Sequence, residues 1–401
     1  MANVSSSNGL EKCPKLRFPG FDEPWKMVSL QDISEYRKNK ICVSKLKYIS
    51  TENMLQNFAG IIPYTSEEDI SGVEFCVGDT LLANIRPYLR KAWLATHDGA
   101  CSTDVLALCP SDITPAFLNN IIEQDRFIDY VMSGVKGSKM PRGDKAHILA
   151  YEIAIPSLLE QEKISSFMQL LHQKIAKIQM EIQLLKKYKR GVFEMVFSQK
   201  VRLIPQSKRK DWQKYKLSDF TTRVTRKNGG QSDIPLTISA QYGLIDQRDF
   251  FSKTIASTDM SGYYLLRSGE YAYNRSTSND YPFGSIKRLE LYPMGAVSTL
   301  YLCFRVKDDI VLSDLAKWYF ESSQWHRGVN EICAEGARNH GLLNVPTDGF
   351  FNTVHTLPSD PEEQLAIASY LSLFQARLDS AQAVLEKLLR IRSGLMQRLF
   401  I

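Results

Sequence analysis

The sequence predicts an α+β protein in which two mixed α/β domains are separated by two long helices that form an antiparallel coiled coil, with a pseudo-two-fold internal repeat. Three observations predict this fold class: a long segment recurs 203 positions later, each copy carries a heptad pattern, and strand-like runs precede each copy. We therefore expect globular domains at 1–157 and 201–357, and long helices at 158–200 and 358–401.

The composition narrows the class of protein. With 401 residues, of which 44% are hydrophobic and 23% charged, the chain has the make-up of a soluble globular protein of two or three domains. No apolar run is long enough for a membrane helix, and the first residues lack a secretory pattern. The 7 cysteines, without a C-x-x-C pair, are expected to be reduced packing residues in a cytoplasmic protein. The net charge of +6 suits a polyanionic partner.

The repeat is clearest over 159–197, which matches 362–400. Both segments follow a strand-like stretch that ends in Pro-Ser, and the likeness extends upstream with looser spacing. The matched pairs include Gln161 with Gln364, Phe167 with Tyr370, Gly191 with Gly394, and Phe197 with Phe400.

Each copy carries apolar residues at alternating steps of four and three, the spacing of a two-helix coiled coil. Nine of the ten positions in each stripe are apolar, and the exception is basic at the same place in both. The alternative is that each helix packs separately on its own domain, but the many lysines on the remaining faces need water. The predicted seam comprises Ile164, Met168, Leu171, Ile175, Ile178, Ile182 and Leu185 with Ile367, Leu371, Phe374, Leu378, Leu385, Leu388 and Leu395.

The two basic exceptions favour an antiparallel pair. In a parallel pair Lys189 would face Arg392, and two like charges partly removed from water would oppose association. In an antiparallel pair Lys189 is expected near Phe374 and Arg392 near Leu171, where the alkyl stems cover apolar groups.

Each globular domain is expected to mix short strands with one clear helix. Thr114 and Pro115 predict a cap followed by a helix, and Ser313 predicts the cap of a second helix. Strands are expected in runs beginning at Val73, Thr80, Val105, Glu270 and Leu300.

Loops in both domains are basic and aromatic. Arginine forks fit guanine edges, Asn fits adenine, and lysines in glycine-rich loops hold phosphates. Solvated surface is the alternative for any one of these residues, and the linker over 207–216 is expected to be solvated. The predicted DNA-binding residues are Arg86, Tyr88, Arg90, Lys136, Lys139, Arg142 and Lys145 in the first domain, and Arg223, Arg226, Arg275, Asn279, Tyr281, Arg338 and His340 in the second.

Motifs for catalysis are missing from the sequence. There is no phosphate-binding loop, no G-x-G, no Asn-Pro-Pro-aromatic tetrad and no G-x-S-x-G elbow, and the histidines lack metal-ligand spacing. The sequence therefore predicts no catalytic residue and no metal site, and favours a protein that recognises over one that catalyses.

The chain resembles the specificity subunit of bacterial type I restriction–modification systems over essentially its full length. The likeness is carried by the segments 14–33, 78–92, 136–145, 155–164 and 357–367, taken together with the repeat. The second helix start departs from the pattern, since Asp360-Pro361 stands where the first copy has Leu158-Leu159.

The resemblance implies two target-recognition domains that each read half of a split, asymmetric DNA sequence, and a coiled coil that sets the spacer and docks the partners. The implied partners are double-stranded DNA, two modification subunits and restriction subunits, with no membrane. The resemblance implies no cofactor on this chain, because S-adenosylmethionine, ATP and Mg are expected on the partner subunits. The rival hypotheses are a coiled-coil scaffold without DNA readout and an enzyme with an unrecognised active site.

Overall fold

The computed structural model describes residues 13–137, 139–239, 242–250, 259–278, 281–333, 338–339 and 341–400; for Phe250, Arg338 and Asn339 only the backbone is described. The chain folds into two compact units. Unit 1 comprises Met1–Gln179 with Ala383–Ile401, and unit 2 comprises Met180–Gln382. Each unit contains one globular head, namely head 1 (13–157) or head 2 (201–357), and a part of each long helix.

Head 1 is built on two four-stranded sheets, with strand orders β2-β9-β6-β7 and β3-β5-β8-β4, and on the pair β1-β10. Among the strand pairs in the described part of head 1, only β4–β8 is parallel. The elements are β1 (Lys26–Ser29), α1 (Leu30–Ile33), β2 (Ser34–Tyr36), β3 (Lys40–Ser44), η1 (Lys45–Lys47), β4 (Tyr48–Ile49), β5 (Asp69–Phe75), β6 (Thr80–Ala83), η2 (Pro87–Leu89), β7 (Ala92–Leu94), β8 (Gly99–Cys101), β9 (Val105–Pro110), α2 (Pro115–Ile122), α3 (Asp125–Ser133), α4 (Lys145–Leu149) and β10 (Glu152–Ile155).

Head 2 repeats part of this plan with the four-stranded sheet β12-β19-β16-β17 and the pair β11-β22. The elements are η3 (Gln206–Lys208), β11 (Gln213–Lys216), α6 (Leu217–Phe220), β12 (Thr221–Arg223), β13 (Leu236–Ser239), β14 (Gly243–Asp246), α7 (Gln247–Phe250), β15 (Tyr264–Arg267), β16 (Tyr271–Asn274), β17 (Ser285–Arg288), β18 (Met294–Val297), β19 (Leu302–Val306), α8 (Ser313–Glu321), α9 (His326–Ile332), β20 (Arg338–Asn339), β21 (Leu342–Leu343), α10 (Thr347–Phe351) and β22 (Val354–Leu357).

The five predicted strand runs overlap β5, β6, β9, β16 and β19. The predicted start of α2 is confirmed: Thr114 is the N-cap and Pro115 the first helical residue, although the Thr114 hydroxyl makes no capping bond. The cap predicted at Ser313 is wrong. Leu312 is the N-cap of α8 and Ser313 its first helical residue, and the Asp308 carboxylate accepts from the Ser313 amide at 2.7 Å.

The long helices are α5 (Leu158–Phe197) and α11 (Pro361–Leu399). Their first residues are 203 positions apart (361 − 158), the same offset as the sequence repeat. Asp360-Pro361 therefore leaves the helix start where the repeat places it. Proline suits the first position because its ring fixes φ near the helical value and the missing N–H needs no partner there.

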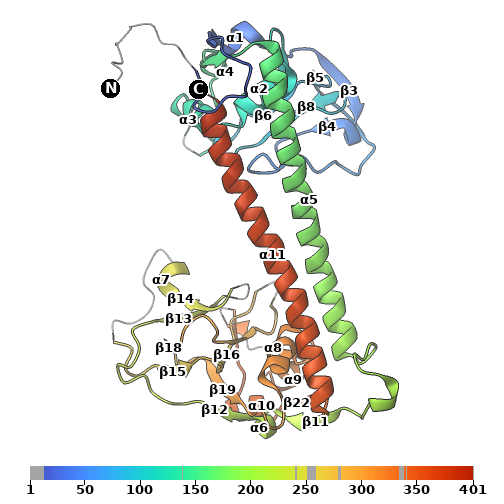
Figure 1. Ribbon diagram of the computed structural model, residues 1–401, viewed down its shortest axis with the longest axis vertical. Coiled ribbons are helices and arrows are strands. Elements are labelled where there is room, and N and C mark those ends of the chain that lie inside the picture. The colour runs from blue at the N-terminus through green and yellow to red at the C-terminus, as the bar shows by residue number, and fades with distance from the viewer. Residues whose placement is uncertain are drawn as a thin grey trace. The chain divides into compact units, whose positions relative to one another are not determined.

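The helices run antiparallel inside each unit. In unit 1 the first turns of α5, with Ile164 and Met168, share a core with the last residues of α11, Leu399 and Phe400. In unit 2 the last turns of α5, with Val196, share a core with the first turns of α11, including Leu371. Figure 1 shows the red end of α11 beside the blue-to-cyan elements of head 1, and the Leu16 amide donates to the Arg398 carbonyl at 2.9 Å. The predicted antiparallel arrangement is confirmed.

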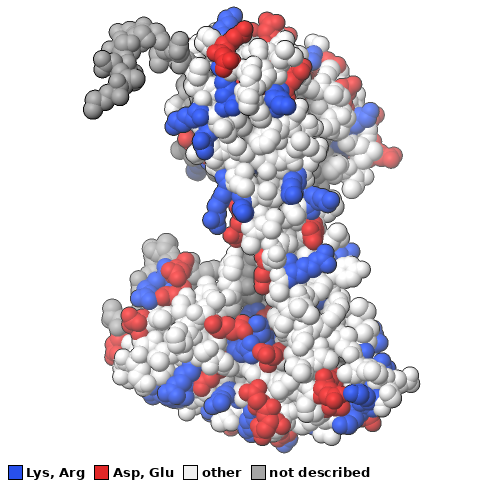
Figure 2. Space-filling model, in the orientation of Figure 1, with Lys and Arg blue, Asp and Glu red and all other residues white. Residues whose placement is uncertain are grey.

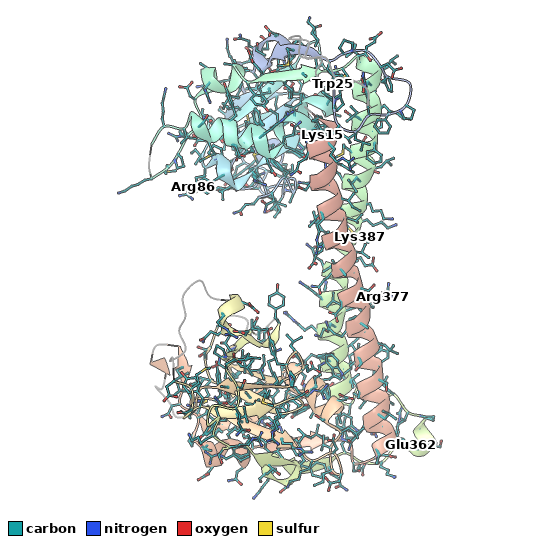
Figure 3. All side chains as sticks on the ribbon, turned by 60° about the vertical axis from the view of Figure 1, so that its left-hand side comes forward. Lys15, Trp25, Arg86, Glu362, Arg377 and Lys387 are labelled. Atoms are coloured by element: carbon teal, nitrogen blue, oxygen red, sulfur yellow. The ribbon has the colours of Figure 1, made fainter. Side chains whose placement is uncertain are left out.

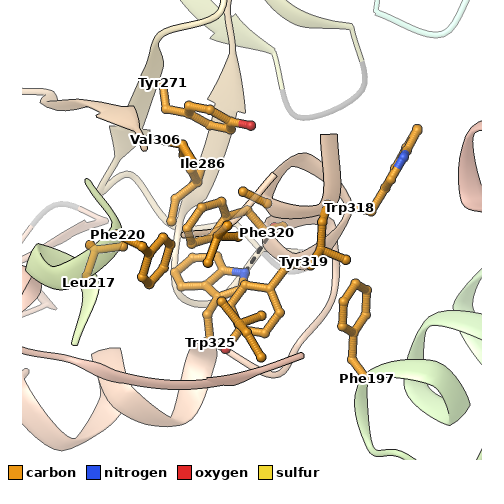
Figure 4. Close-up of a cluster of buried hydrophobic side chains, with 14 of the residues drawn as sticks. Phe197, Leu217, Phe220, Tyr271, Ile286, Val306, Trp318, Tyr319, Phe320 and Trp325 are labelled. Carbon is orange, nitrogen blue, oxygen red and sulfur yellow. Dashed lines mark hydrogen bonds between the residues drawn. The ribbon is translucent and has the colours of Figure 1, made fainter. Parts of the chain in front are cut away.

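The core of unit 2 joins head 2 to α5 through aromatic side chains (Figure 4), and Ile367, Ala368 and Leu371 of α11 share this core. Phe197, at the end of α5, meets Tyr319 of α8 edge-to-face at 5.4 Å. In unit 1 Phe400, the repeat partner of Phe197, packs at 5.3 Å on Phe117 of α2. Each long helix thus ends on the equivalent helix of a head, and burial of these large rings stabilises the junction.

Candidate nucleic-acid interface

The predicted basic residues of head 1 lie on two neighbouring loops, 86–90 and 136–145. The Arg86 amide donates to the Pro141 carbonyl at 2.8 Å, and the Gly143 amide donates to the Asn84 carbonyl at 3.2 Å. Ile85 and Arg142 also form a β-bridge. The structure therefore brings together residues that are about fifty positions apart in the sequence.

Carboxylates neutralise three of these basic side chains. Arg90 pairs with Asp125 at 2.7 Å, Arg142 with Asp104 at 2.9 Å, and Lys136 with Asp144. The bond from Lys136 and those from two α4 amides hold the pKa of Asp144 at about 2, so this carboxylate stays charged. The pairs restrain the loops and reduce the positive charge that they present.

Other residues of the two loops are available to a ligand. Arg86, Tyr88, Lys139 and Lys145 are exposed, and within the described residues no ion pair is formed by Arg86, Lys139 or Lys145. Arg86 lies at the edge of head 1 in Figure 3. These four side chains combine three cations with one aromatic ring, a set suited to phosphates, base edges and sugars.

In head 2 two of the predicted arginines are engaged within the fold. Arg226 pairs with the buried Glu270 at 2.7 Å, and Glu270 also accepts from the Arg267 amide. Arg275 donates to the Leu300 carbonyl at 3.0 Å. Both guanidinium groups brace connections between strands, so neither is simply a free surface charge.

The remaining predicted residues of head 2 fall into three groups. Arg223 is exposed at the end of the edge strand β12. Tyr281 is half-buried, and its amide donates to the Ser278 carbonyl at 3.1 Å. Asn279 and His340 lie outside the described residues, and of Arg338 only the backbone, paired with Leu343, is described. Lys and Arg are interspersed with Asp and Glu on the face shown in Figure 2.

Sequence reasoning missed the turn formed by Gln56, Asn57, Phe58 and Ala59. It bonds directly to the 86–90 loop, through the Phe58 amide and the Arg90 carbonyl at 2.8 Å. An asparagine close to Gly60 was the available signal, because asparagine accepts a left-handed backbone more readily than most residues.

Each head is fixed to the start of a long helix by a buried ion pair. Arg17 holds Glu160 of α5 through two bonds, of 2.9 and 2.8 Å, and Arg202 holds Glu363 of α11 in the same bidentate manner. Both glutamates are 1% exposed and stand 203 positions apart (363 − 160). A carboxylate that is this deeply buried needs such a partner.

The residue after each of these glutamates is a glutamine whose side-chain amide also bonds to the head. The Gln161 side chain accepts from the Thr114 amide at 2.9 Å and donates to the Pro156 carbonyl at 3.0 Å. Gln364 accepts from the Leu312 amide at 2.7 Å and donates to the Pro358 carbonyl at 2.8 Å. The pseudo-two-fold repeat therefore extends to individual hydrogen bonds.

The two basic exceptions in the seam face acidic helix ends in the heads. Burial raises the pKa of Glu123, at the end of α2, to about 7, and Arg392 opposes the rise. In unit 2 burial lowers the pKa of Lys189, and Glu321, at the end of α8, opposes the fall. Lys189 donates to the side chain of Gln375, the residue after Phe374, at 2.8 Å, and its ammonium lies over the Phe193 ring.

The predicted seam side chains lie on the inner stripe of each helix, where all of them are buried or half-buried, while their helical neighbours are mostly exposed. Within unit 2 the buried members include Ile182, Leu185 and Leu378, and within unit 1 Ile175 is 5% exposed. Glu181 and Arg377 add a pair at 3.2 Å between the helices of unit 2.

Apolar residues are also exposed at repeat positions on the outer helix faces. Leu170 is 66% and Leu373 is 73% exposed, and Phe167 matches Tyr370 in the same way. Tyr188 and Ile391 form a third exposed pair. Exposed apolar side chains therefore recur at equivalent positions on the outer faces of the two helices.

Within the described parts of the chain, no three His, Cys, Asp or Glu side chains are grouped so as to hold a metal ion. None of the described helices is long and apolar enough to cross a membrane.

Comparisons with known proteins find similarity in part of the sequence and in the fold. Residues 22–187 match the family described as "Type I restriction modification DNA specificity domain". A curated relative, the type I restriction enzyme EcoDI specificity subunit of Escherichia coli, is 31% identical over 91 residues, or 23% of this chain; the match spans 20% of that relative's length.

Two solved structures share the fold. The S subunit of a type I restriction–modification system from M. genitalium has a TM-score of 0.61 at 12% identity, over 97% of this chain and 99% of that one. A chain from a study of complex assembly and conformational transition of the type I R-M system has a TM-score of 0.52 at 14% identity, over 96% and 98%. The resemblance inferred from the sequence and the fold class are confirmed.

Proposed function

We propose that this chain, which resembles the specificity subunits of type I restriction–modification systems, is the DNA-recognition subunit of such a complex. Each head reads one half of a bipartite, asymmetric DNA target. The observation that carries this proposal is the duplicated attachment of two heads to one antiparallel helix pair, in which Arg17–Glu160 and Arg202–Glu363 occupy equivalent places. One chain thereby presents two related surfaces to one duplex.

The heads differ in the side chains that they present, which supports an asymmetric target. Head 1 offers Arg86, Tyr88 and Lys139 on paired loops, whereas head 2 engages Arg226 and Arg275 internally. Side chains that read base edges determine sequence preference, so surfaces of different chemistry favour different bases.

The helix pair is proposed to set the spacer and to bind the partner subunits. An α-helix of 40 residues is about 60 Å long at 1.5 Å per residue, longer than one turn of DNA at about 34 Å. The exposed pairs Phe167 with Tyr370 and Leu170 with Leu373 suit two copies of one modification subunit. Restriction subunits complete the complex.

Catalysis is proposed to reside on the partners. The modification subunits would bind S-adenosylmethionine and methylate adenine, and the restriction subunits would use ATP and Mg. This chain then acts as a non-catalytic subunit that selects the sequence, without a cofactor of its own and in the cytoplasm.

The experiment is a genome-wide map of methylated adenines in a host that carries this chain with its modification subunit. The expected result is one bipartite, asymmetric motif that disappears when this chain is omitted. A map that does not change when the chain is omitted, or methylation by the isolated chain, would refute the proposal.

A further inference from the structure

Left-handed backbone is concentrated at one place in head 1. Among the described residues, five that are not glycine have positive φ, and four of them are Asn57, Phe58, Arg86 and Arg90. A bulky residue such as phenylalanine rarely adopts this conformation, and strained backbone of this kind clusters at functional sites. The cluster marks a part of head 1 whose shape is held against local preference.

Asn57 and Phe58 occupy the tip of a tight turn in the connection from β4 to β5. Met54 and Ile61 form a β-bridge, the Leu55 amide donates to the Gly60 carbonyl at 2.8 Å, and the Ala59 amide donates to the Gln56 carbonyl at 3.3 Å. Positive φ at both central residues, 56° and 58°, is the signature of a type I′ turn. Asparagine suits the first central position of such a turn.

The 86–90 loop holds this turn in place. The Asn57 amide donates to the Leu89 carbonyl at 3.2 Å, and the Phe58 amide donates to the Arg90 carbonyl at 2.8 Å. The Phe58 ring packs against the core of unit 1, which anchors the turn from below. Two backbone amides and one ring therefore fix the direction of the turn, and none of these groups is left for a ligand.

The Asn57 side chain is the group left over. This side chain is exposed, and its carboxamide group, unlike the backbone amide of Asn57, makes no hydrogen bond with another described residue. The neighbouring loop presents the exposed Arg86 and Tyr88. A rigid amide beside a cation and an aromatic ring has the chemistry of a base reader, because a side-chain amide forms two hydrogen bonds with the N6 and N7 edge of adenine.

We infer that the turn at 56–59 is a base-reading element of head 1 and that the Asn57 amide recognises an adenine in the half-site that this head reads. The inference rests on the proposed function and adds a residue and a base to it. Arg86, on the adjoining loop, contacts the same half-site. The two strained turns hold the side chains of Asn57 and Arg86 in fixed positions relative to the DNA groove.

The test compares methylated-adenine maps from hosts carrying the modification subunit with the full chain or a variant. Asn57→Gly removes the side-chain amide and leaves a residue that adopts positive φ without steric cost. Methylation at sites with another base in one position of one half-site is expected to rise about tenfold or more relative to the wild-type motif. Asn57→Asp, which offers only acceptors, is expected to shift that position from adenine toward cytosine.

The matched control is Gln199→Gly, which removes a side-chain amide at the fifth residue with positive φ, after the end of α5. Its motif is expected to equal that of the wild type. If Asn57→Gly leaves the motif unchanged, or weakens methylation equally at every site, the inference is overturned while the proposed function stands. If the wild-type chain directs no bipartite motif, the proposed function itself fails.

Discussion

At the scale of residues, the attachment of each head rests on one buried carboxylate. Glu363 accepts two bonds from Arg202 and a third from the Trp212 indole at 3.1 Å. Removing the guanidinium would leave this carboxylate buried and unpaired, and such a change costs about 3–5 kcal/mol.

Arg202→Met is therefore expected to lower the free energy of unfolding by about 3–5 kcal/mol in urea titrations. The control is Lys208→Met, which removes an exposed pair with the neighbouring Glu362 and is expected to leave the free energy of unfolding nearly unchanged. Equal losses in the two variants would show that burial of Glu363 is not what makes its pair important.

The Glu123 carboxylate and the His172 ring lie 3.6 Å apart, measured between Oε2 and Nε2. Their pKa values are shifted in opposite directions. Burial raises the pKa of Glu123 from 4.5 to about 7, so folding favours its protonated form, and its contribution to stability falls as the pH rises from 4.5 to 7. Burial, with help from Arg392, lowers the pKa of His172 from 6.5 to about 4, so its contribution rises as the pH rises from 4 to 6.5.

In the wild type the two effects largely cancel between pH 4.5 and 6.5. His172→Gln installs the residue found at the repeat position 375. In this variant only the Glu123 contribution is expected to remain, so the free energy of unfolding falls as the pH rises. In Glu123→Gln only the His172 contribution is expected to remain, so the free energy of unfolding rises with pH. Unfolding titrations at several pH values measure both, and variants that remain parallel to the wild type would contradict the assignment.

Arg223 and Arg226 separate recognition from stability. Arg226→Ala leaves Glu270 buried without its partner and is expected to destabilise head 2 by about 2–4 kcal/mol in thermal unfolding. Arg223→Ala is expected to leave stability unchanged and to weaken DNA binding by the complex, with a smaller salt dependence. Loss of stability in both variants, or in neither, would show that the structural roles are misassigned.

This contrast also shows what the sequence could predict. Basic residues in loops were identifiable from composition and spacing. Their partners were not, because Glu270 is 44 positions from Arg226 and the Leu300 carbonyl is 25 from Arg275. Only the folded chain shows which arginines are already engaged.

At the scale of elements, the long helices were the most predictable part, because a heptad pattern reports on burial along one stripe. The bounds at Leu158 and Pro361 agree with the repeat, and all predicted seam residues lie on the inner face. The short strands were found only in part, since runs of four residues in β-sheets carry little pattern of their own. The 207–216 linker was expected to be solvated; its lysines are exposed, but Lys208 and Lys210 also pair with the start of α11.

The helix pair offers a test of the spacer. Adding four residues to both helices, after Gln179 and after Gln382, lengthens each by about 6 Å, close to two base-pair rises. These positions are repeat partners, 203 apart, so both helices are lengthened at equivalent points. Methylation maps are expected to show an unchanged pair of half-sites with a longer spacer, and an unchanged spacer would refute the role of the helices in spacing.

At the scale of the whole chain, the first residues of head 1 bond to the end of α11 as the first residues of head 2 bond to the end of α5. The Leu16 amide donates to the Arg398 carbonyl near the end of α11, and the Val201 amide donates to the Met195 carbonyl near the end of α5. Arg398 and Met195 are repeat partners, 203 positions apart, and Leu16 directly precedes Arg17 as Val201 precedes Arg202. The start of head 1 is therefore bonded to the end of α11 in the way that the start of head 2 is bonded to the end of α5, although head 1 comes first in the sequence.

The most direct measurement is the methylation map directed by a chain in which residues 14–198 are repeated in tandem, so that head 1 occurs twice. If two heads related by a pseudo-two-fold axis each read one half-site, this chain directs methylation to an inverted repeat of the half-site read by head 1. A map that keeps the second half of the wild-type motif, or that stays asymmetric, would contradict the account.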